Sequence, residues 1–198
     1  MILLEPVSIC KLQYKELQER TERFELLARE QYVMGSPRVD LLLTLIHYNV
    51  WRALSSNNSA LGFNMEWLDG GAVSPFNSPI ILESYASIPL CLRPSQLQHT
   101  VEHHPWIDLL PFPALRDNLL CQGDDYDDND ICHDVVEIFD RPSEEAGLIV
   151  WGEPSSPFGW EASEDFVKKW AWALVGCSEL LESTNYWRLK RGETILEI

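Results

Sequence analysis

The longest apolar stretch of the chain begins directly after a helix-start signal. Ser36 is a good N-cap residue and Pro37 suits the first helical position, and the run from Val39 to Leu54 is apolar on nearly every face. A helix that is apolar all round is a buried one. We therefore predict a helix at the centre of the core. The charged stretch from Lys11 to Tyr32 has only a narrow apolar stripe, which predicts an amphipathic surface helix.

The middle of the chain alternates between short helical patterns and residues that break them. The segment from Gly62 to Pro89 is rich in Gly, Pro, Asn and Ser, which predicts loops and short turns. Helices are predicted from Ser95 to His103 and from Pro113 through Leu120, because Pro113 fits a first helical turn. The acidic run from Asp124 to Asp130 predicts a loop.

The C-terminal third combines one strand-like run with a strong helical pattern. Leu148 to Trp151 is the only convincing β-like segment, and one strand cannot form a sheet. Ser163 is an N-cap, and the apolar stripe after it predicts one long helix through Leu181. The predicted fold class is mainly α: a single compact helical domain with long proline-rich loops and at most a minor β element. Residues 1–36 would form the N-terminal amphipathic helix and residues 37–198 the helical domain.

Composition narrows the functional classes. The 198 residues carry 31 acidic and 15 basic side chains, a net charge of −16, so phosphate backbones and anionic lipid surfaces should repel the chain. We expect no direct nucleic-acid binding and no membrane binding, since no run reaches the ~18 apolar residues of a membrane span. The five cysteines form no CxxC pair, which favours reduced thiols in the cytoplasm, or in the nucleus if the protein is regulatory.

Three blocks of sequence resemble a known family. They are LTLIHYNVWRAL from Leu43, HHPWIDLLPFP from His103 leading into Arg116-Asp117-Asn118, and a C-terminal set that includes VWGEP from Val150 and STNYWR from Ser183. Together they resemble the fungal domain of unknown function that commonly follows a basic leucine zipper in ascomycete transcription factors. The resemblance extends from about Asp40 to Glu193.

The resemblance implies little chemistry, because in this family the zipper binds the DNA. We expect this chain to stand alone without a zipper, since the stretch before Tyr32 has as many acidic as basic residues and no Asn/Arg-rich contact segment. One position departs from the family pattern: Ser155 follows Gly-Glu-Pro where the family usually has Trp. If Ser155 points inward, it opens space for part of a ligand. If it lies on the surface, Ser is merely tolerated there.

The densest cluster of titratable side chains surrounds two adjacent histidines. His103 and His104 lie beside Trp106 and Asp108, with Arg116 one short turn later. A histidine held by a carboxylate can act as base, acid or hydrogen-bond donor to a carbonyl, and an arginine can hold a carboxylate. The alternative is a buried polar network that fixes the proline-broken loop.

Metal motifs are incomplete in this sequence. Asp124 to Asp128 spells DDxxD, which binds magnesium diphosphate in terpene cyclases, but there the ligands come from facing helices of a much larger domain. We interpret the run as an exposed acidic loop. Cys121, Cys132 and His133 lack a fourth zinc ligand at a standard spacing. We therefore predict no metal. The absence of a phosphate-binding glycine loop and of a dinucleotide fingerprint also predicts no cofactor.

Two functional hypotheses follow. In the first, the chain binds an apolar small molecule and converts it without a cofactor, as a cyclase, cycloaddition catalyst or isomerase of fungal secondary metabolism. His103, His104 and Arg116 would act as donors, oriented by Asp108 and Glu153. Glu153 is alternatively a loop carboxylate that accepts backbone N–H groups. The candidate residues around the substrate are Trp51, Trp106, Trp151, Ser155, Trp160 and Trp170.

The second hypothesis is a non-catalytic regulatory domain that senses a ligand or binds a partner through its acidic surface. A closed apolar cavity would favour the first hypothesis, whereas a filled core with an exposed apolar patch of several hundred Å² would favour a protein partner. We favour the catalyst, because a domain without its DNA-binding segment needs some activity of its own. The eight tryptophans among 198 residues and Ser155 add to this support. A homodimer is left open by both hypotheses.

Overall fold

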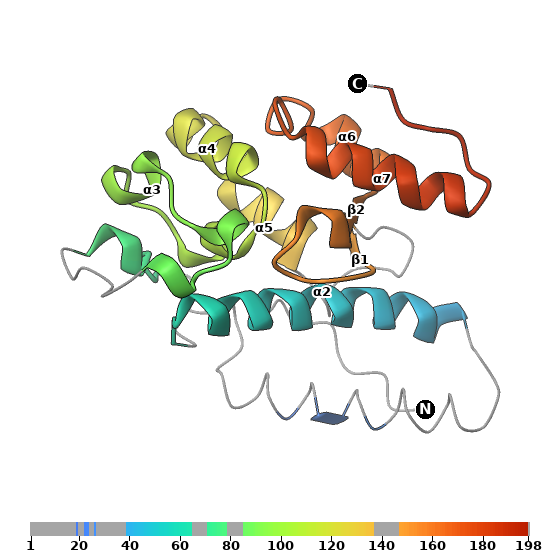
Figure 1. The fold of residues 1–198 in the computed structure, drawn as a ribbon, viewed down its shortest axis with the longest axis horizontal. Coiled ribbons are helices and arrows are strands. Elements are labelled where there is room, and N and C mark those ends of the chain that lie inside the picture. The colour runs from blue at the N-terminus through green and yellow to red at the C-terminus, as the bar shows by residue number, and fades with distance from the viewer. Residues whose placement is uncertain are drawn as a thin grey trace.

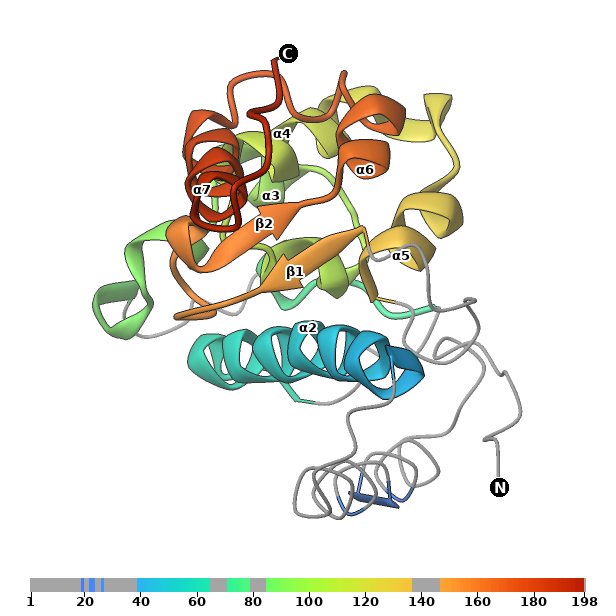
Figure 2. The same cartoon turned by 90° about the vertical axis from the view of Figure 1, so that its right-hand side faces the viewer.

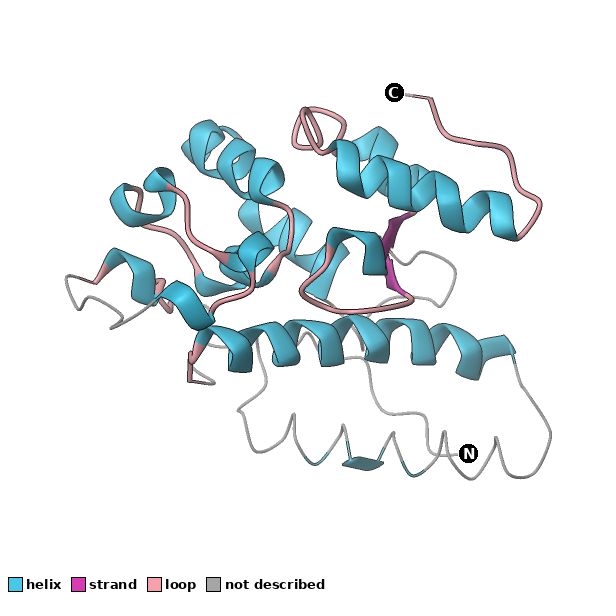
Figure 3. Ribbon diagram, viewed as in Figure 1, coloured by secondary structure: helices cyan, strands magenta, loops and turns pink. Residues whose placement is uncertain are grey.

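The computed structural model describes residues 39–64, 71–78, 85–136 and 147–197, together with positions 19, 22, 23 and 26. Apart from those four positions, the amphipathic helix predicted for residues 11–32 lies outside the described residues, as does the domain boundary at residue 36. Helices dominate the described part, which confirms the mainly α fold class (Figures 1 and 3). The helices are α2 (Val39–Leu61), α3 (Gln96–Thr100), α4 (Pro113–Gln122), α5 (Asp128–Val136), α6 (Glu164–Lys169) and α7 (Ser178–Lys190).

Short 3-10 turns occupy the connections, and most of them begin at or next to a proline. The described parts of the segment predicted as loops and short turns contain such turns, which confirms that prediction there. A proline at the start of a turn fixes φ and needs no N–H partner. The 3-10 turns are η3 (Pro75–Asn77), η4 (Tyr85–Ser87), η5 (Leu90–Leu92), η6 (Pro105–Leu109), η7 (Gly123–Asp125) and η8 (Pro157–Gly159).

Helix α2 is longer than the apolar run that predicted it. It continues from Leu54 to its last residue, Leu61, and the next residue, Gly62, has a φ of 72°, which is accessible to glycine at little cost. The extension contains Asn57 and Asn58, which are polar but buried. Asn58 Nδ2 donates to the carbonyl oxygens of Phe63 and Asn64 just past the helix, so Asn58 helps to end the helix.

The β element is a two-stranded hairpin, where the sequence predicted one strand. Strand β1 (Leu148–Val150) pairs antiparallel with β2 (Trp160–Ala162), with Leu148 opposite Ala162 and Val150 opposite Trp160. Figure 2 shows the hairpin between two helical layers, with α2 against β1 and α7 against β2. The second strand was missed because its three residues include Glu161 and do not form an apolar run like the one that predicted β1.

The predicted long C-terminal helix is wrong: the structure has two helices there. Helix α6 begins at its N-cap Ser163 as predicted but ends at Lys169, and α7 begins at Ser178. Between them Gly176 has a φ of 79°, which interrupts the helix. Asn118 Nδ2, from α4, donates to the carbonyl oxygens of Ala173 and Val175 in this break. A tertiary contact therefore satisfies backbone groups that a continuous helix would have bonded internally.

Two predicted boundaries in the middle of the chain also change. Helix α3 is capped by Ser95 in a capping box with Gln98, but it ends at Thr100, so His103 lies in an extended segment after it. The predicted acidic loop is a helix from Asp128 onward, because the acidic residues occupy the first turn of α5, where the helix dipole favours negative charge. Helix α4 begins at Pro113 as predicted.

The core is one cluster of apolar side chains drawn from every layer. Figure 1 shows α2 passing beneath both the proline-rich half, with α3 and α4, and the half formed by the hairpin, α6 and α7. Within the described residues, no helix is long and apolar enough to cross a membrane. The described cysteines are free thiols: Cys91, Cys121, Cys132 and Cys177.

Candidate functional site

The predicted cluster around His103 forms a buried hydrogen-bond network centred on the Asp108 carboxylate. Asp108 lies in η6 and has no exposed surface. Its Oδ2 accepts a hydrogen bond from Ser74 Oγ at 2.6 Å. Its Oδ1 accepts from Gln98 Nε2 at 2.6 Å and lies 2.8 Å from His103 Nε2. Polar side chains from three other positions of the chain therefore converge on one carboxylate.

Both ring nitrogens of His103 face oxygen acceptors. Nδ1 lies 2.7 Å from the carbonyl oxygen of Val101, and Nε2 faces Asp108. A carbonyl and an ionised carboxylate only accept hydrogen bonds, so the imidazolium alone satisfies both nitrogens. Burial acts to lower the pKa of His103, but the hydrogen bond to Asp108, the charge of that carboxylate and the Val101 carbonyl together raise this pKa above its usual value. His103 and Asp108 thus form a buried ion pair.

A buried arginine from α4 completes the network. Arg116 Nε donates to Gln98 Oε1 at 3.1 Å, so the Gln98 amide bridges the guanidinium and the Asp108 carboxylate. Burial lowers the pKa of Arg116 to about 10, which leaves the guanidinium charged at pH 7. Its remaining donors bond to the backbone carbonyl oxygens of Cys91, Arg93 and Leu110.

The network lies inside the protein and its polar groups bond to one another or to the backbone. Its side chains are all buried: Ser74, Gln98, His103, Asp108 and Arg116. A general acid or base must come within hydrogen-bond distance of the substrate atom that exchanges the proton. This arrangement instead holds the proline-rich segment 89–113 against α4, which favours the structural alternative for the cluster.

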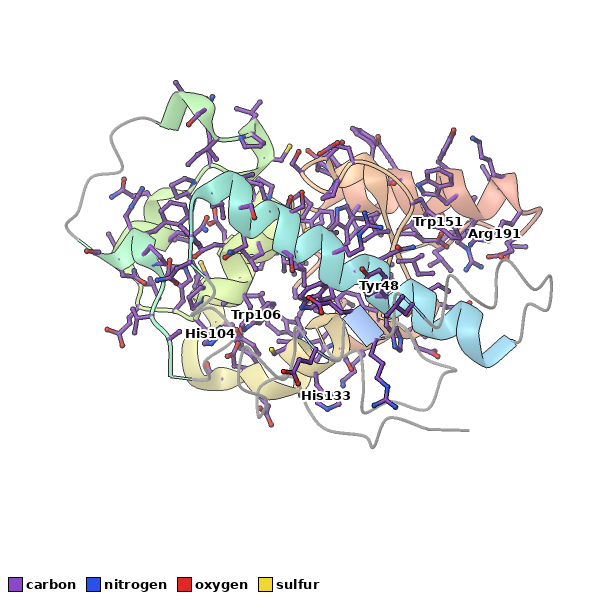
Figure 4. All side chains as sticks on the ribbon, turned by 90° about the horizontal axis from the view of Figure 1, so that it is seen from below. Tyr48, His104, Trp106, His133, Trp151 and Arg191 are labelled. Carbon is purple, nitrogen blue, oxygen red and sulfur yellow. The ribbon has the colours of Figure 1, made fainter. Side chains whose placement is uncertain are left out.

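His104 and Trp106 lie next to one another (Figure 4), in the segment of the chain between His103 and Asp108. His104 is the N-cap of η6, and its Nδ1 accepts a hydrogen bond from the backbone N–H of Trp106 at 3.4 Å. Trp106 is buried in the core, and its Nε1 has no hydrogen-bond partner in the described part of the chain. The ring therefore contributes to core packing.

The second group of predicted residues lies at the turn between β1 and β2. Trp160 is fully buried; its Nε1 donates to the Pro154 carbonyl at 2.9 Å and its ring meets Phe112 edge to face. Ser155 is partly exposed, and its Oγ lies 3.2 Å from Oε1 of the exposed Glu153. The hydroxyl of Ser155 therefore faces a surface carboxylate.

Asn57, which the sequence analysis did not single out, joins the two groups. Its Nδ2 donates to the carbonyl oxygens of Leu109 at 2.8 Å and Pro154 at 2.9 Å. One buried amide from α2 thus ties η6, which carries Asp108, to the turn that follows β1. Both acceptors are backbone carbonyls, which leave no trace in the residue types, so the sequence offered no sign of this contact.

Two of the predicted substrate-binding tryptophans lie in other places. Trp170 is buried, and its Nε1 donates to Asp134 Oδ2 at 2.6 Å. Trp51, on α2, is partly buried and stacks with Tyr48 at 6.2 Å between ring centroids. The structure therefore distributes the predicted tryptophans over several places instead of bringing them together around one site.

Trp151 belongs to an exposed cluster built by the hairpin and α7. Its Nε1 donates to Glu161 Oε2 at 2.6 Å, and its ring stacks on Trp187 with centroids 5.6 Å apart. Arg191 lies over the Trp151 ring, beside it in Figure 4, and donates to both Glu161 oxygens at 2.8 and 2.5 Å. Hydrogen bonds to Glu161 and Glu193 raise the pKa of Arg191. The buried Glu161 therefore fixes an exposed indole and a guanidinium together.

Further side chains extend this cluster along α7 and η8. Tyr186 meets Trp187 edge to face at 5.1 Å, and Lys190 Nζ lies 4.6 Å from the Tyr186 centroid and 5.2 Å from that of Trp187. Trp187 Nε1 donates to the Phe158 carbonyl at 3.4 Å. We name this group the aromatic surface, which comprises Trp151, Phe158, Tyr186 and Trp187 with Lys190 and Arg191. In the sequence, Tyr186 and Trp187 stood out only as part of a family motif, although adjacent aromatic residues followed by a lysine were an available signal.

A family profile described as a domain of unknown function, DUF3425, matches residues 80–181, just over half of the chain. The chain belongs to the DUF3425 family. This confirms the family resemblance that the three sequence blocks indicated. No curated protein and no solved structure matches the chain.

The DUF3425 match contains most of the buried network, since only Ser74 precedes it. The aromatic surface crosses the end of the match: its hairpin and η8 members lie inside, and its α7 members follow. Among the described residues of this DUF3425 chain, no group of three or more His, Cys, Asp or Glu side chains is arranged to hold a metal ion.

Proposed function

We propose that this DUF3425 chain is a non-catalytic domain that binds another protein chain through the aromatic surface. The observation that carries the proposal is the exposure of that surface: Trp151 is 45% exposed, Tyr186 51% and Phe158 56%. An aromatic side chain has about 150–250 Å² to bury, so half of three such side chains is roughly 300 Å². A patch of this size is comparable to the largest exposed apolar patch of a typical monomer, about 300–600 Å², and such patches are often functional.

The aromatic surface is also held in place before any partner arrives. Trp151 is fixed by its bond to Glu161 and by stacking on Trp187, and Glu161 is 2% exposed and bonded to Arg191. A side chain that is already ordered loses less conformational freedom on binding. Tryptophan, tyrosine and arginine are the residues most often found at the energetic centres of protein interfaces.

The catalytic hypothesis receives less support from the arrangement of its residues. The candidates His103, Asp108 and Arg116 are buried with partners inside the protein, and Glu153 lies at the surface of a different turn. The predicted tryptophans do not face one common site. A cyclase of the predicted kind requires donors and aromatic walls around the same substrate.

A pull-down with a matched control tests the proposed function. The purified chain is immobilised and exposed to an extract of its source cells, and retained proteins are identified and then rebound in purified form. The double variant Trp151→Ser, Phe158→Ser should lose binding at least about tenfold, because interface aromatics are common hot spots. The control Leu90→Ser removes a more exposed apolar side chain, 75% exposed, from η5 in the other half of the molecule.

Retention that is equal for the wild type and the folded double variant would contradict the proposal. The same extract tests the catalytic hypothesis. A mass-neutral conversion of a metabolite by the native chain, absent with a boiled sample, would establish a cofactor-free cyclase or isomerase and overturn the non-catalytic assignment.

A further inference from the structure

The exposed face of α7 carries a self-complementary pattern of charge. Glu182, Tyr186 and Lys190 are spaced by four residues, so they lie along one side of the helix, and all three are exposed. The acidic residue lies toward the N-terminus of α7, the aromatic ring at the centre, and the basic residue toward the C-terminus. When two such helices lie antiparallel, the acidic end of one stripe therefore faces the basic end of the other.

The two charges of this stripe are unpaired within the described chain. Glu182 takes part in no hydrogen bond or ion pair with another described residue. Lys190 contacts only the rings of Tyr186 and Trp187 among the described side chains. Eight residues of α-helix separate the two by about 12 Å along the axis, too far for an ion pair within one chain.

The neighbouring basic residues of α7 differ from Lys190, because they already have carboxylate partners. Arg188 lies 3.4 Å from Glu193, and Arg191 bonds to both Glu161 and Glu193. Glu193 lies past the end of α7 and is held by these two arginines. Lys190 and Glu182 are thus the charges of this stripe that remain available for a partner.

We infer that the partner of the aromatic surface is a second copy of this chain, with the two α7 helices packed antiparallel about a two-fold axis at Tyr186. Tyr186 is midway between Glu182 and Lys190, so this axis places Glu182 of each copy opposite Lys190 of the other. A two-fold interface repeats every contact, which gives two ion pairs on either side of a central pair of tyrosine rings. Trp187 and Trp151 continue the apolar contact at its edge.

The inference rests on the proposed function, because it names the occupant of the same surface. It adds a geometric requirement that other partners do not share: positions 182 and 190 must meet across the interface. Charge reversal at either position replaces both ion pairs by like-charge contacts. A mixed dimer of the two variants restores opposite charges at both contacts. At one contact, the lysine introduced at position 182 of one variant faces the glutamate introduced at position 190 of the other. At the second contact, the two unaltered side chains face each other.

The experiment uses sedimentation equilibrium of the purified chain at about 0.15 M salt, where long-range repulsion between the acidic molecules is largely screened. The wild type should form a species of twice 22.8 kDa. Glu182→Lys alone and Lys190→Glu alone should each raise the dimer dissociation constant roughly tenfold or more, because two close contacts change sign. An equimolar mixture of the two variants should associate as tightly as the wild type.

Matched controls separate this geometry from a general effect of charge. Glu102→Lys and Lys168→Glu make the same charge changes at exposed positions away from the α7 stripe and should leave the dissociation constant unchanged. A mixture that associates no better than its components overturns the antiparallel pairing. A wild-type chain that stays monomeric at high micromolar concentration also overturns it, and if the aromatic surface still retains a different protein, the proposed function stands without it.

Discussion

Glu161 and Trp151 are joined by a hydrogen bond of 2.6 Å between a buried carboxylate and an exposed indole. The carboxylate lies on β2 and the indole just after β1, so the bond closes across the hairpin. Arg191, from the end of α7, binds the same carboxylate through two N–H groups. One side chain therefore couples the hairpin to the last helix and sets the orientation of the aromatic surface.

Glu161→Gln should loosen this surface and destabilise the fold. The amide keeps the shape of the carboxylate but presents a donor to donors from Trp151 and Arg191, so we expect the free energy of unfolding to fall by about 2 kcal/mol. Urea denaturation measures the loss, and iodide quenching of tryptophan fluorescence should increase as Trp151 is freed. Glu193→Gln is the control, because Glu193 is an exposed partner of the same arginine and should contribute less than about 0.5 kcal/mol.

Asp108→Asn should be among the most destabilising single substitutions. The variant leaves the His103 and Arg116 charges in the core without the compensating carboxylate, and breaking a buried ion pair in this way costs about 3 kcal/mol or more. The measurement is again urea denaturation. The exposed Asp125, changed to Asn, should stay within about 0.5 kcal/mol of the wild type. A variant Asp108→Asn as stable as that control would show that the network contributes little.

The stability should depend on pH through His103. Its pKa in the folded chain is raised above the value of about 6.5 that it has when unfolded. A proton bound more tightly in the folded state stabilises that state, so the contribution is fully present below about pH 6.5 and is lost as the pH rises through the folded pKa.

We therefore expect the free energy of unfolding of the wild type to decline above about pH 6.5. His103→Gln should remove this part of the decline, and His133→Gln, on α5, should retain it. Urea denaturation at a series of pH values gives the slopes. Equal slopes for the wild type and His103→Gln would contradict the assignment of the imidazolium.

Asn57→Ala should weaken the connection between η6 and the turn that joins β1 to β2. The variant removes the two hydrogen bonds to Leu109 and Pro154 and takes this donor away from the buried Leu109 carbonyl, whereas the Pro154 carbonyl keeps Trp160 Nε1; the loss should cost about 2 kcal/mol. Hydrogen exchange should then accelerate at η6 and at the β1–β2 turn together. Ser59→Ala is the control on the same helix, because its exposed hydroxyl bonds only within α2. Faster exchange on one side alone would show that Asn57 does not couple the two.

Much of the fold followed from local patterns. The apolar run of α2, the Pro113 start of α4 and the Ser163 cap of α6 were each predicted, because they depend on residues within a few positions of one another. The break between α6 and α7 was not predicted, because it depends on Gly176 together with the side-chain amide of Asn118 from α4. The helix of α5 was missed because a run of aspartates is typical of a loop as well as of a helix N-terminus.

Part of the candidate site was likewise predicted from neighbouring residues, and part of it was missed. The sequence placed His103, Asp108 and Arg116 in one cluster because they are neighbours in the chain, and the structure confirms that they share a network. It did not show that Ser74 and Gln98 complete that network. The aromatic surface was missed as a unit, because Trp151 and Trp187 are far apart in the chain and meet only when α7 packs on the hairpin.

The sequence by itself determined the mainly α class, the starts of α4 and α6 and the grouping of His103, Asp108 and Arg116, because each depends on side chains close together in the chain, and its motifs indicated the family. Only the tertiary structure decided which polar residues are buried with partners and which aromatic residues remain exposed. Burial depends on how distant segments pack against each other. The positions of Glu161 and Asn57, which bond to residues far away in the chain, were therefore fixed only when the layers assembled.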